Sequence, residues 1–320
     1  MTIAWPDLPI EVAFPDLSRW AAGNTGTPYV WRFASGTPGP HALVQALTHG
    51  NEVCGGIALD ELLASGFRPA RGTLTAVFAN IDAYARWDPA SPFKSRCVDE
   101  DFNRVWTDAV LSGPRDSADL ARARALRPFY DACEYLLDLH SMTDPCPPLA
   151  LAGRRAKGVA LARGLGVPRD IVVDAGHATG TRLRDYAFFD DPDDPRAALL
   201  VECGQHWEKS AVDVARQSTL RFLRHLGVAD DDYVVPRLDR GEPPPQRIVE
   251  ITHAVTIHSD RFEFAMPVAG LVAIPRAGTL LAHDGDAEVR TPYDNCLPIM
   301  PTRRPKKGET AVRLGRYVGG

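Results

Sequence analysis

The stretch Leu43-Val44-Gln45-Ala46-Leu47-Thr48-His49-Gly50-Asn51-Glu52 joins an apolar run to a histidine and a glutamate three residues apart. The apolar run is typical of a buried strand, and a helical pattern follows Glu52. His49 and Glu52 therefore stand just past the end of a strand, where both side chains can point at one metal ion. A neutral imidazole nitrogen and an anionic carboxylate oxygen are both good zinc ligands.

A third candidate ligand, His140, ends the segment Leu136-Leu137-Asp138-Leu139-His140. Three protein ligands leave one position open for water, which is typical of catalytic rather than structural zinc. The alternative is a helix-capping carboxylate and two ordinary core histidines. The joint pattern favours the metal site, because both histidines end apolar strands, where open α/β sheets place their sites. We therefore predict one Zn²⁺ per chain, held by His49, Glu52 and His140.

Glu202 ends another apolar run, Leu199-Leu200-Val201. A buried carboxylate is costly unless it is paired or used. Beside a metal it could serve as general base and then as general acid. A salt bridge at the edge of the sheet is an equally good explanation of Glu202 taken alone.

Two arginines, Arg96 and Arg104, bracket three acidic residues in one short segment. Guanidinium groups bind carboxylates in a fork and can stabilise the oxyanion of a tetrahedral intermediate. Taken alone, however, this segment is better explained as a charged surface cluster.

Strand and helix patterns alternate through the first two thirds of the chain. Apolar runs predict buried strands at 29–33, 43–47, 74–79, 135–139, 171–173 and 198–203. Helical patterns predict helices at 52–64, 117–133, 154–165 and 208–226, with Pro128 expected to kink or split the second of them. Residues 1–232 are therefore predicted to form an α/β domain with a mixed, largely parallel central sheet flanked by helices.

The pattern changes after Asp232. The segment Gly241-Glu242-Pro243-Pro244-Pro245 cannot continue a helix and indicates a stiff connector. Short β-like pieces follow at 248–257, 270–274 and 279–282. Residues 233–320 are therefore predicted to form a smaller C-terminal β domain that caps the site.

Composition narrows the class of protein. The chain has 36 basic and 41 acidic residues and no basic stripe, so no nucleic-acid partner is expected. No apolar run approaches the ~18 residues that span a bilayer, and the N-terminus lacks a secretory signal pattern. Six cysteines without paired spacing indicate reduced thiols of a cytoplasmic protein. The oligomeric state is left open, a homo-oligomer included.

Four motifs, at 48–52, 101–104, 138–140 and 201–204, occur in an order and spacing that resembles the succinylglutamate desuccinylase/aspartoacylase family. They span about half of the chain. The family has a zinc carboxypeptidase-like fold. The resemblance implies that His49, Glu52 and His140 bind zinc and that Glu202 activates the bound water.

The resemblance also implies roles around the metal. Arg96 would polarise the scissile carbonyl, while Asn103 and Arg104 would hold the carboxylate end of the substrate. Tyr293 is the best candidate for a tyrosine that closes the pocket from the C-terminal domain. A further substrate-binding arginine is expected before Glu202, but the sequence does not separate the three candidates Arg182, Arg184 and Arg196.

The sequence departs from the aspartoacylase pattern immediately after the predicted base. Aspartoacylases continue with Gly-Pro-Gln, whereas this chain has Gly204-Gln205-His206-Trp207-Glu208. This difference leaves the substrate open. His206 and Trp207 either line the pocket or begin a helix with a packed indole.

The leading hypothesis is a zinc-dependent amidohydrolase that removes the acyl group from a small anionic N-acyl amino acid. A metallocarboxypeptidase acting on short peptides would use the same chemistry and is the second hypothesis. A non-catalytic protein that binds metal or ligand on the same fold is the third, although a binding module needs no positioned base. The acyl group and the amino acid are not identified.

Overall fold

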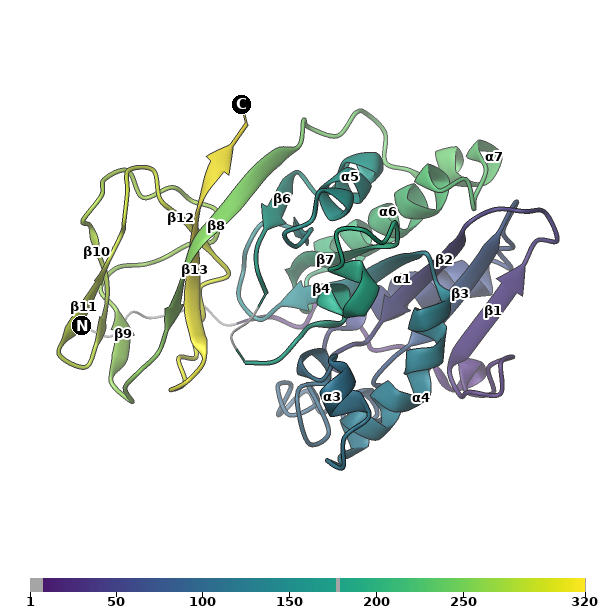
Figure 1. Cartoon of the computed structure of the whole chain (residues 1–320), viewed down its shortest axis with the longest axis horizontal. Helices are drawn as coiled ribbons and strands as arrows, with labels where there is room; N and C mark the ends of the chain where they lie inside the picture. The colour runs from purple at the N-terminus through teal and green to yellow at the C-terminus, as the bar shows by residue number, and fades with distance from the viewer. Residues whose placement is uncertain (1–7, 177–178, 320) are drawn as a thin grey trace.

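Ten strands form one mixed sheet in the order β1-β3-β2-β4-β7-β5-β6-β8-β13-β12 (Figure 1). This computed structural model describes residues 8–176 and 179–319. A second sheet of three antiparallel strands, in the order β11-β10-β9, lies beside the end of the large one. The fold class predicted from sequence is confirmed: a mixed, largely parallel central sheet with helices, and a smaller C-terminal sheet.

The strands of the large sheet have the following bounds: β1 Val30–Ala34, β2 His41–Ala46, β3 Thr73–Phe78, β4 Tyr135–Met142, β5 Leu149–Leu151, β6 Asp170–Val173, β7 Ala197–Gln205, β8 Arg247–Thr256, β12 Leu297–Ile299 and β13 Thr310–Val318. The small sheet consists of β9 Phe262–Phe264, β10 Leu280–Asp284 and β11 Ala287–Arg290. The range 270–274, expected as a strand, forms only an isolated bridge from Ile274 to Cys296.

The helices have the following bounds: α1 Val53–Ala64, α2 Ile81–Tyr84, α3 Asp108–Leu111, α4 Ala118–Ala132, α5 Ala156–Leu165, α6 Lys209–His225 and α7 Asp231–Val234. Short 3₁₀ turns are η1 Ser18–Trp20, η2 Phe102–Arg104, η3 Leu183–Asp185, η4 Ala187–Phe189 and η5 Val235–Arg237. No helix in the described part of the chain is long and apolar enough to cross a membrane.

Pro128, expected to kink or split its helix, does not split it, because α4 continues through Pro128 as one element. Proline removes one helix hydrogen bond. Buried side chains on both sides of it, Leu126 and Phe129, pack into the core and offset that loss.

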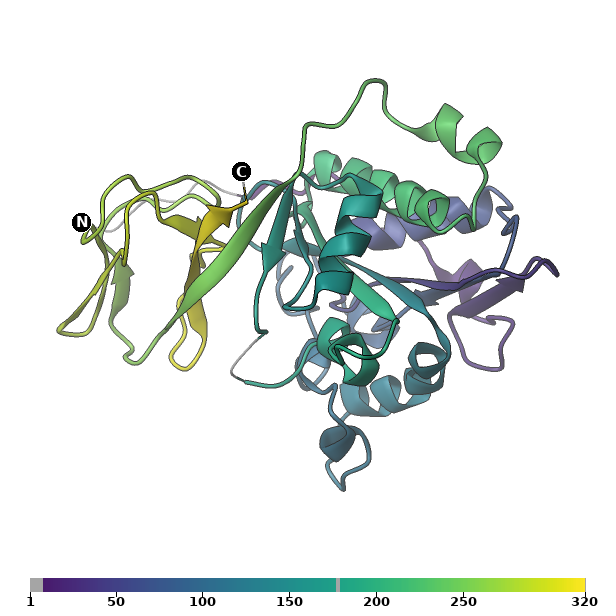
Figure 2. The same cartoon turned by 45° about the horizontal axis from the view of Figure 1, so that its top comes forward.

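Alternate strand residues face two separate layers of core. In β2, Ala42, Val44 and Ala46 pack into the core under α1 and α6, whereas Leu43 packs into the core under α4. This is the period of two that a strand requires. Helices therefore cover both faces of the sheet, as Figure 2 shows with α6 on one face and α4 on the other.

The parallel order of β2, β4 and β7 positions the site. β2 pairs in parallel with β4, and β4 pairs in parallel with β7. Their carboxyl ends therefore meet at one edge of the sheet, which is where open α/β sheets bind ligands.

The large sheet does not stop at the predicted domain boundary. β6 pairs with β8, and β8 pairs with β13, so strands on both sides of residue 232 share one hydrogen-bonded sheet. The division into 1–232 and 233–320 stays a prediction.

Candidate active site

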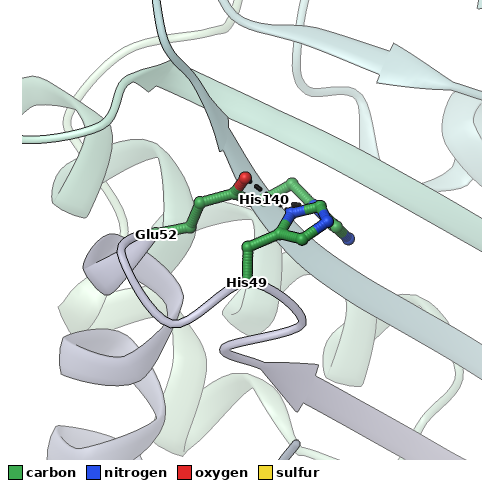
Figure 3. A group of neighbouring side chains, drawn as sticks. All are labelled: His49, Glu52 and His140. Atoms are coloured by element: carbon green, nitrogen blue, oxygen red, sulfur yellow. Dashed lines mark hydrogen bonds and ion pairs between the residues drawn. The ribbon is translucent and has the colours of Figure 1, made fainter. Parts of the chain in front are cut away.

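His49, Glu52 and His140 converge at the carboxyl edge of the sheet (Figure 3). One ligand atom from each lies within 4.8 Å of the others, and all three residues are buried. Nδ1 of His49 lies 2.7 Å from Oε1 of Glu52, and Nδ1 of His140 lies 2.9 Å from Oε2 of the same carboxylate. The two imidazoles thus present the same nitrogen to one glutamate.

The turn after β2 delivers two of these side chains. Leu47, buried at the end of β2, has a φ of 60°, an unusual conformation for a branched residue. The chain then turns through His49 to Glu52, the N-cap residue of α1. The Glu52 side chain makes no capping bond to α1 and instead accepts from the backbone N–H of Ser141, at 3.1 Å. The alternative of a helix-capping carboxylate therefore does not apply.

The outer nitrogens of both histidines face carboxylates. Nε2 of His140 lies 2.9 Å from Oδ2 of Asp138, and Nε2 of His49 lies 3.0 Å from Oδ1 of Asp101. Histidines that bind metals usually donate their second ring N–H to such a partner, which fixes the ring and the tautomer. The donor set and its outer partners therefore fit a zinc ion at the Nδ1 side.

Charge in this cluster favours a cation. Burial alone would raise the pKa of Glu52, but His49 and His140 bring it well below its usual value. Burial alone would lower the pKa of His140, but Asp138 and Glu52 raise it well above its usual value. The carboxylates thus stabilise positive charge at this point, which a proton or a metal ion can supply.

Glu202 lies next to His140 on the neighbouring strand, because the register of β4 and β7 pairs these two residues. It is only 6% exposed, and its Oε2 has no hydrogen-bond partner among the described residues. Burial raises the pKa of Glu202 to about 8, although His140 opposes the shift. A divalent cation nearby would lower that pKa towards neutrality.

Arg96 contacts the cluster from the long loop after α2. Its Nη1 donates to Oε1 of Glu52 at 3.2 Å, and its Nη2 donates to Oδ2 of Asp101 at 3.1 Å. Nη2 also lies 2.9 Å from Nε2 of His49, so that nitrogen either accepts from Arg96 or donates to Asp101. Asp101 thereby links the arginine to the histidine.

A cavity of about 530 Å³ opens onto this cluster. It is lined by seven of the eight residues that the sequence singles out: His49, Glu52, Arg96, Asn103, Arg104, His140 and Glu202. Of these described candidates, Tyr293 alone lies outside the lining, and its hydroxyl is 2.6 Å from Oγ1 of Thr252.

The structure separates the three arginines that precede Glu202. Arg182 lines the cavity and is held by Asp174, with distances of 2.9 and 2.7 Å, and by Asp185, at 2.6 Å. Neither Arg184 nor Arg196 is among the described residues that line it.

Arg313 is a cavity residue that the sequence motifs do not include. It is 6% exposed, lines the cavity from β13, and lies 3.9 Å from Asp174. A signal does exist, because Arg313 interrupts the apolar pattern of β13 between Val312 and Leu314. A charge at a buried strand position is costly unless it is used.

His206 and Trp207 are adjacent in sequence but have different surroundings. His206 lines the cavity, with its nitrogens 2.9 Å from Oγ of Ser141 and 3.3 Å from Oγ1 of Thr143. Burial lowers the pKa of His206 to about 3, so this imidazole is neutral. The Trp207 indole is buried and donates to the carbonyl of Asn51, at 3.2 Å.

Comparison with known proteins points to one family. Residues 38–225 match the model of the succinylglutamate desuccinylase/aspartoacylase catalytic domain. A comparison with curated protein sequences gives no match.

Solved structures share the fold at low sequence identity. A succinylglutamate desuccinylase from Vibrio parahaemolyticus is 17% identical with a TM-score of 0.66, covering 91% of this chain and 87% of its own. The enzyme from Vibrio cholerae is 17% identical with a TM-score of 0.67, covering 91% and 86%. The product-bound ectoine utilization protein EutE (DoeB) from Ruegeria pomeroyi is 20% identical with a TM-score of 0.59, covering 89% and 87%. At these identities the likeness establishes the fold.

Proposed function

The chain belongs to the succinylglutamate desuccinylase/aspartoacylase family, and we propose that it is a zinc-dependent amidohydrolase that removes the acyl group from a small anionic N-acyl amino acid. The observation that carries the proposal is Glu202. Its buried carboxylate lies beside a His-Glu-His cluster in a cavity, with one oxygen that has no partner in the described part of the chain. A site for binding metal alone has no use for this costly group.

His49, Glu52 and His140 would hold one zinc ion per chain, as their converging Nδ1 and carboxylate atoms support. Bound zinc would lower the pKa of water towards ~7 and polarise an amide carbonyl. Asp138 holds the His140 imidazole in the orientation and tautomer that a metal ligand needs, and Asp101 would do the same for His49 when Nε2 of that ring donates to it.

Glu202 takes a proton from the attacking water and passes it to the nitrogen of the leaving amine. Arg96 stabilises the negative charge that develops on the carbonyl oxygen. Support for this role of Arg96 is its fixed position, with one guanidinium nitrogen on Glu52 and the other on Asp101.

The substrate carboxylate binds Arg104 and Asn103, and we add Arg182 and Arg313 to this subsite. Five arginines line the cavity against four carboxylates, and a divalent cation would make the balance more positive. This charge favours an anionic substrate. Tyr293 stays a proposed substrate contact, without support from the cavity lining.

Residues 233–320 are proposed to act as a cap on the site. Support comes from the cavity lining, to which this segment contributes Thr302, Arg304, Glu309 and Arg313. A capped cavity suits a small acyl amino acid better than the peptide of a metallocarboxypeptidase. A cytoplasmic location also stays a proposal, and the six free cysteines agree with a reducing compartment.

The test is hydrolysis by the zinc-loaded protein of a panel of N-acyl amino acids that includes N-acetyl-aspartate and N-succinyl-glutamate. Glu202→Gln should retain one zinc per chain and lose about 10²- to 10⁴-fold in kcat, the usual contribution of a general base. Glu250→Gln, the same change on the partly exposed surface of β8, should leave kcat unaltered. Full activity in Glu202→Gln would refute the mechanism.

A further inference from the structure

Asp119, in the first turn of α4, is fully buried and lies outside the cavity lining. Its carboxylate accepts hydrogen bonds from three successive backbone N–H groups, those of Val98, Asp99 and Glu100. The three distances are 3.2, 2.6 and 3.0 Å. A fourth bond, of 2.6 Å, comes from the side-chain amide of Asn80.

The beginning of α4 and this loop hold each other reciprocally. The backbone N–H of Ala118 donates to Oδ2 of Asp99 at 2.7 Å, and Oγ of Ser117 donates to Oε1 of Glu100 at 2.6 Å. The loop has no helix or strand from residue 95 to 101, so no ladder holds its backbone. The hydrogen bonds between this loop and residues 117–119, here called the anchor on α4, hold the loop backbone instead.

The two ends of the anchored loop carry groups of the site. Arg96 precedes the three N–H donors and contacts Glu52, while Asp101 follows them and contacts His49. The same two residues also bond to each other, at 3.1 Å. A displaced loop would therefore move the proposed oxyanion group and the outer partner of a proposed metal ligand together.

We infer that Asp119 is a positioning residue for the reaction: it fixes the loop that sets the Arg96 guanidinium against Glu52. The inference rests on the proposed function, in which Arg96 stabilises the transition state. Asp119 touches neither the cavity nor the metal cluster, so its effect passes through the loop.

Two accepting oxygens are required at this position. Oδ1 accepts from Asn80 and Val98, and Oδ2 accepts from Asp99 and Glu100. An asparagine in either orientation would turn its NH₂ group towards two N–H donors. Two of these bonds would be lost, and the loop would have to shift.

The experiment is a double-mutant cycle of Asp119→Asn and Arg96→Ala, measured as kcat, KM and bound zinc. Asp119→Asn should keep one zinc per chain and lose about 10- to 100-fold in kcat, as misplacement of a catalytic group by about 1 Å does. In the Arg96→Ala background the same change should cost less than about 3-fold, because groups that act as one unit are not additive.

Asp170→Asn is the matched control. Asp170 is also a buried carboxylate, but it lies on β6 and accepts from Arg247, at 2.7 to 3.0 Å. The Asp170→Asn variant should have a lower melting temperature and an unchanged kcat. Should Asp119→Asn fail to fold, Ser117→Ala removes the bond to Glu100 together with the capping bond from the N–H of Leu120, and it should lower kcat in the same direction, by about 3-fold.

Two results would overturn the inference: normal kcat in the folded variant, or full additivity with Arg96→Ala. Failure of the proposed function looks different. In that case Arg96→Ala and Glu202→Gln would themselves retain full activity. If those two variants are impaired while the Asp119 variant is normal, the function stands and the positioning role falls.

Discussion

Gly50 lies between the first two proposed metal ligands, where the turn after β2 meets two other backbone segments. A Cβ atom at this position would lie 2.4 Å from the carbonyl carbon of Ala83, the carbonyl oxygen of Ser95 and the nitrogen of Tyr84. All three are backbone atoms, so no side chain can move aside. The site therefore depends on glycine here for close approach.

Gly50→Ala should lower the free energy of unfolding by roughly 1–3 kcal/mol, the usual cost of overpacking. It should also weaken zinc binding, because His49 and Glu52 flank the clash. Chemical denaturation and a zinc titration measure the two effects. Gly56→Ala in α1 is the control, since its nearest neighbour is the movable side chain of Leu47, at 3.2 Å. Equal behaviour of the two variants would contradict this account.

The buried imidazole of His206 should make the free energy of unfolding depend on pH. Its pKa is lowered to about 3 by burial, whereas an unfolded histidine titrates near 6.5. Below pH 6.5 the unfolded chain therefore binds the proton first, and stability falls as the pH drops towards 3. Between pH 7 and pH 5 this effect lowers the free energy of unfolding by about 2 kcal/mol.

Removing the imidazole should remove that contribution. In the metal-free protein, His206→Gln should lose less stability than the unaltered protein between pH 7 and pH 5, by about 2 kcal/mol. Urea unfolding at the two pH values gives the comparison. The same loss in both proteins would show that His206 does not titrate in this way.

At the scale of elements, β13 brings Arg313 into the cavity beside Arg182. Arg313→Met should raise KM for the anionic substrate by about 10- to 100-fold with a smaller change in kcat, because a hydrogen bond to a charged group contributes about 1.5–3 kcal/mol. Arg316→Met, on the same strand but exposed, is the control. An unchanged KM would remove Arg313 from the substrate subsite.

Much of the sheet can be predicted from sequence, because strands covered on both faces are continuously apolar. All six strands expected in the first 232 residues are present, with ends within three residues of the expected ones. β5 is too short to predict, since it has three residues directly after Pro147 and Pro148. The order of the strands, and the pairing of β8 and β13 with the main sheet, depend on long-range contacts that local patterns do not contain.

The centre of the site could be predicted because its residues lie near the carboxyl ends of parallel strands. His140 and Glu202 are register partners on β4 and β7, and His49 follows β2. Sequence alone does not separate Arg182 from Arg184 and Arg196, and it marks Arg313 only as a charge within an apolar strand. Arg182 and Arg313 meet through the strand order β6-β8-β13 and the turn before η3, which local patterns do not contain. Tyr293 is suggested by its residue type and its segment, neither of which determines where the side chain points.

At the scale of the whole molecule, the cavity draws its residues from both ends of the chain. The metal cluster comes from the turn after β2 and from β4, while Arg304 and Arg313 come from the last twenty residues. Arg303 pairs with Asp144 at 3.2 Å, and Arg304 stacks over Phe93, so the loop between β12 and β13 is tied to the α/β part. These contacts support the proposed capping role.

We propose that hydrolysis by this protein depends on one metal ion held by His49, Glu52 and His140. The most direct measurement is amide hydrolysis by the metal-free protein during a zinc titration, with the N-acyl amino acid that the panel shows to be turned over best. Activity should rise from near zero and level off at one zinc per chain. Full activity without metal, or no activity at one equivalent, would contradict the account.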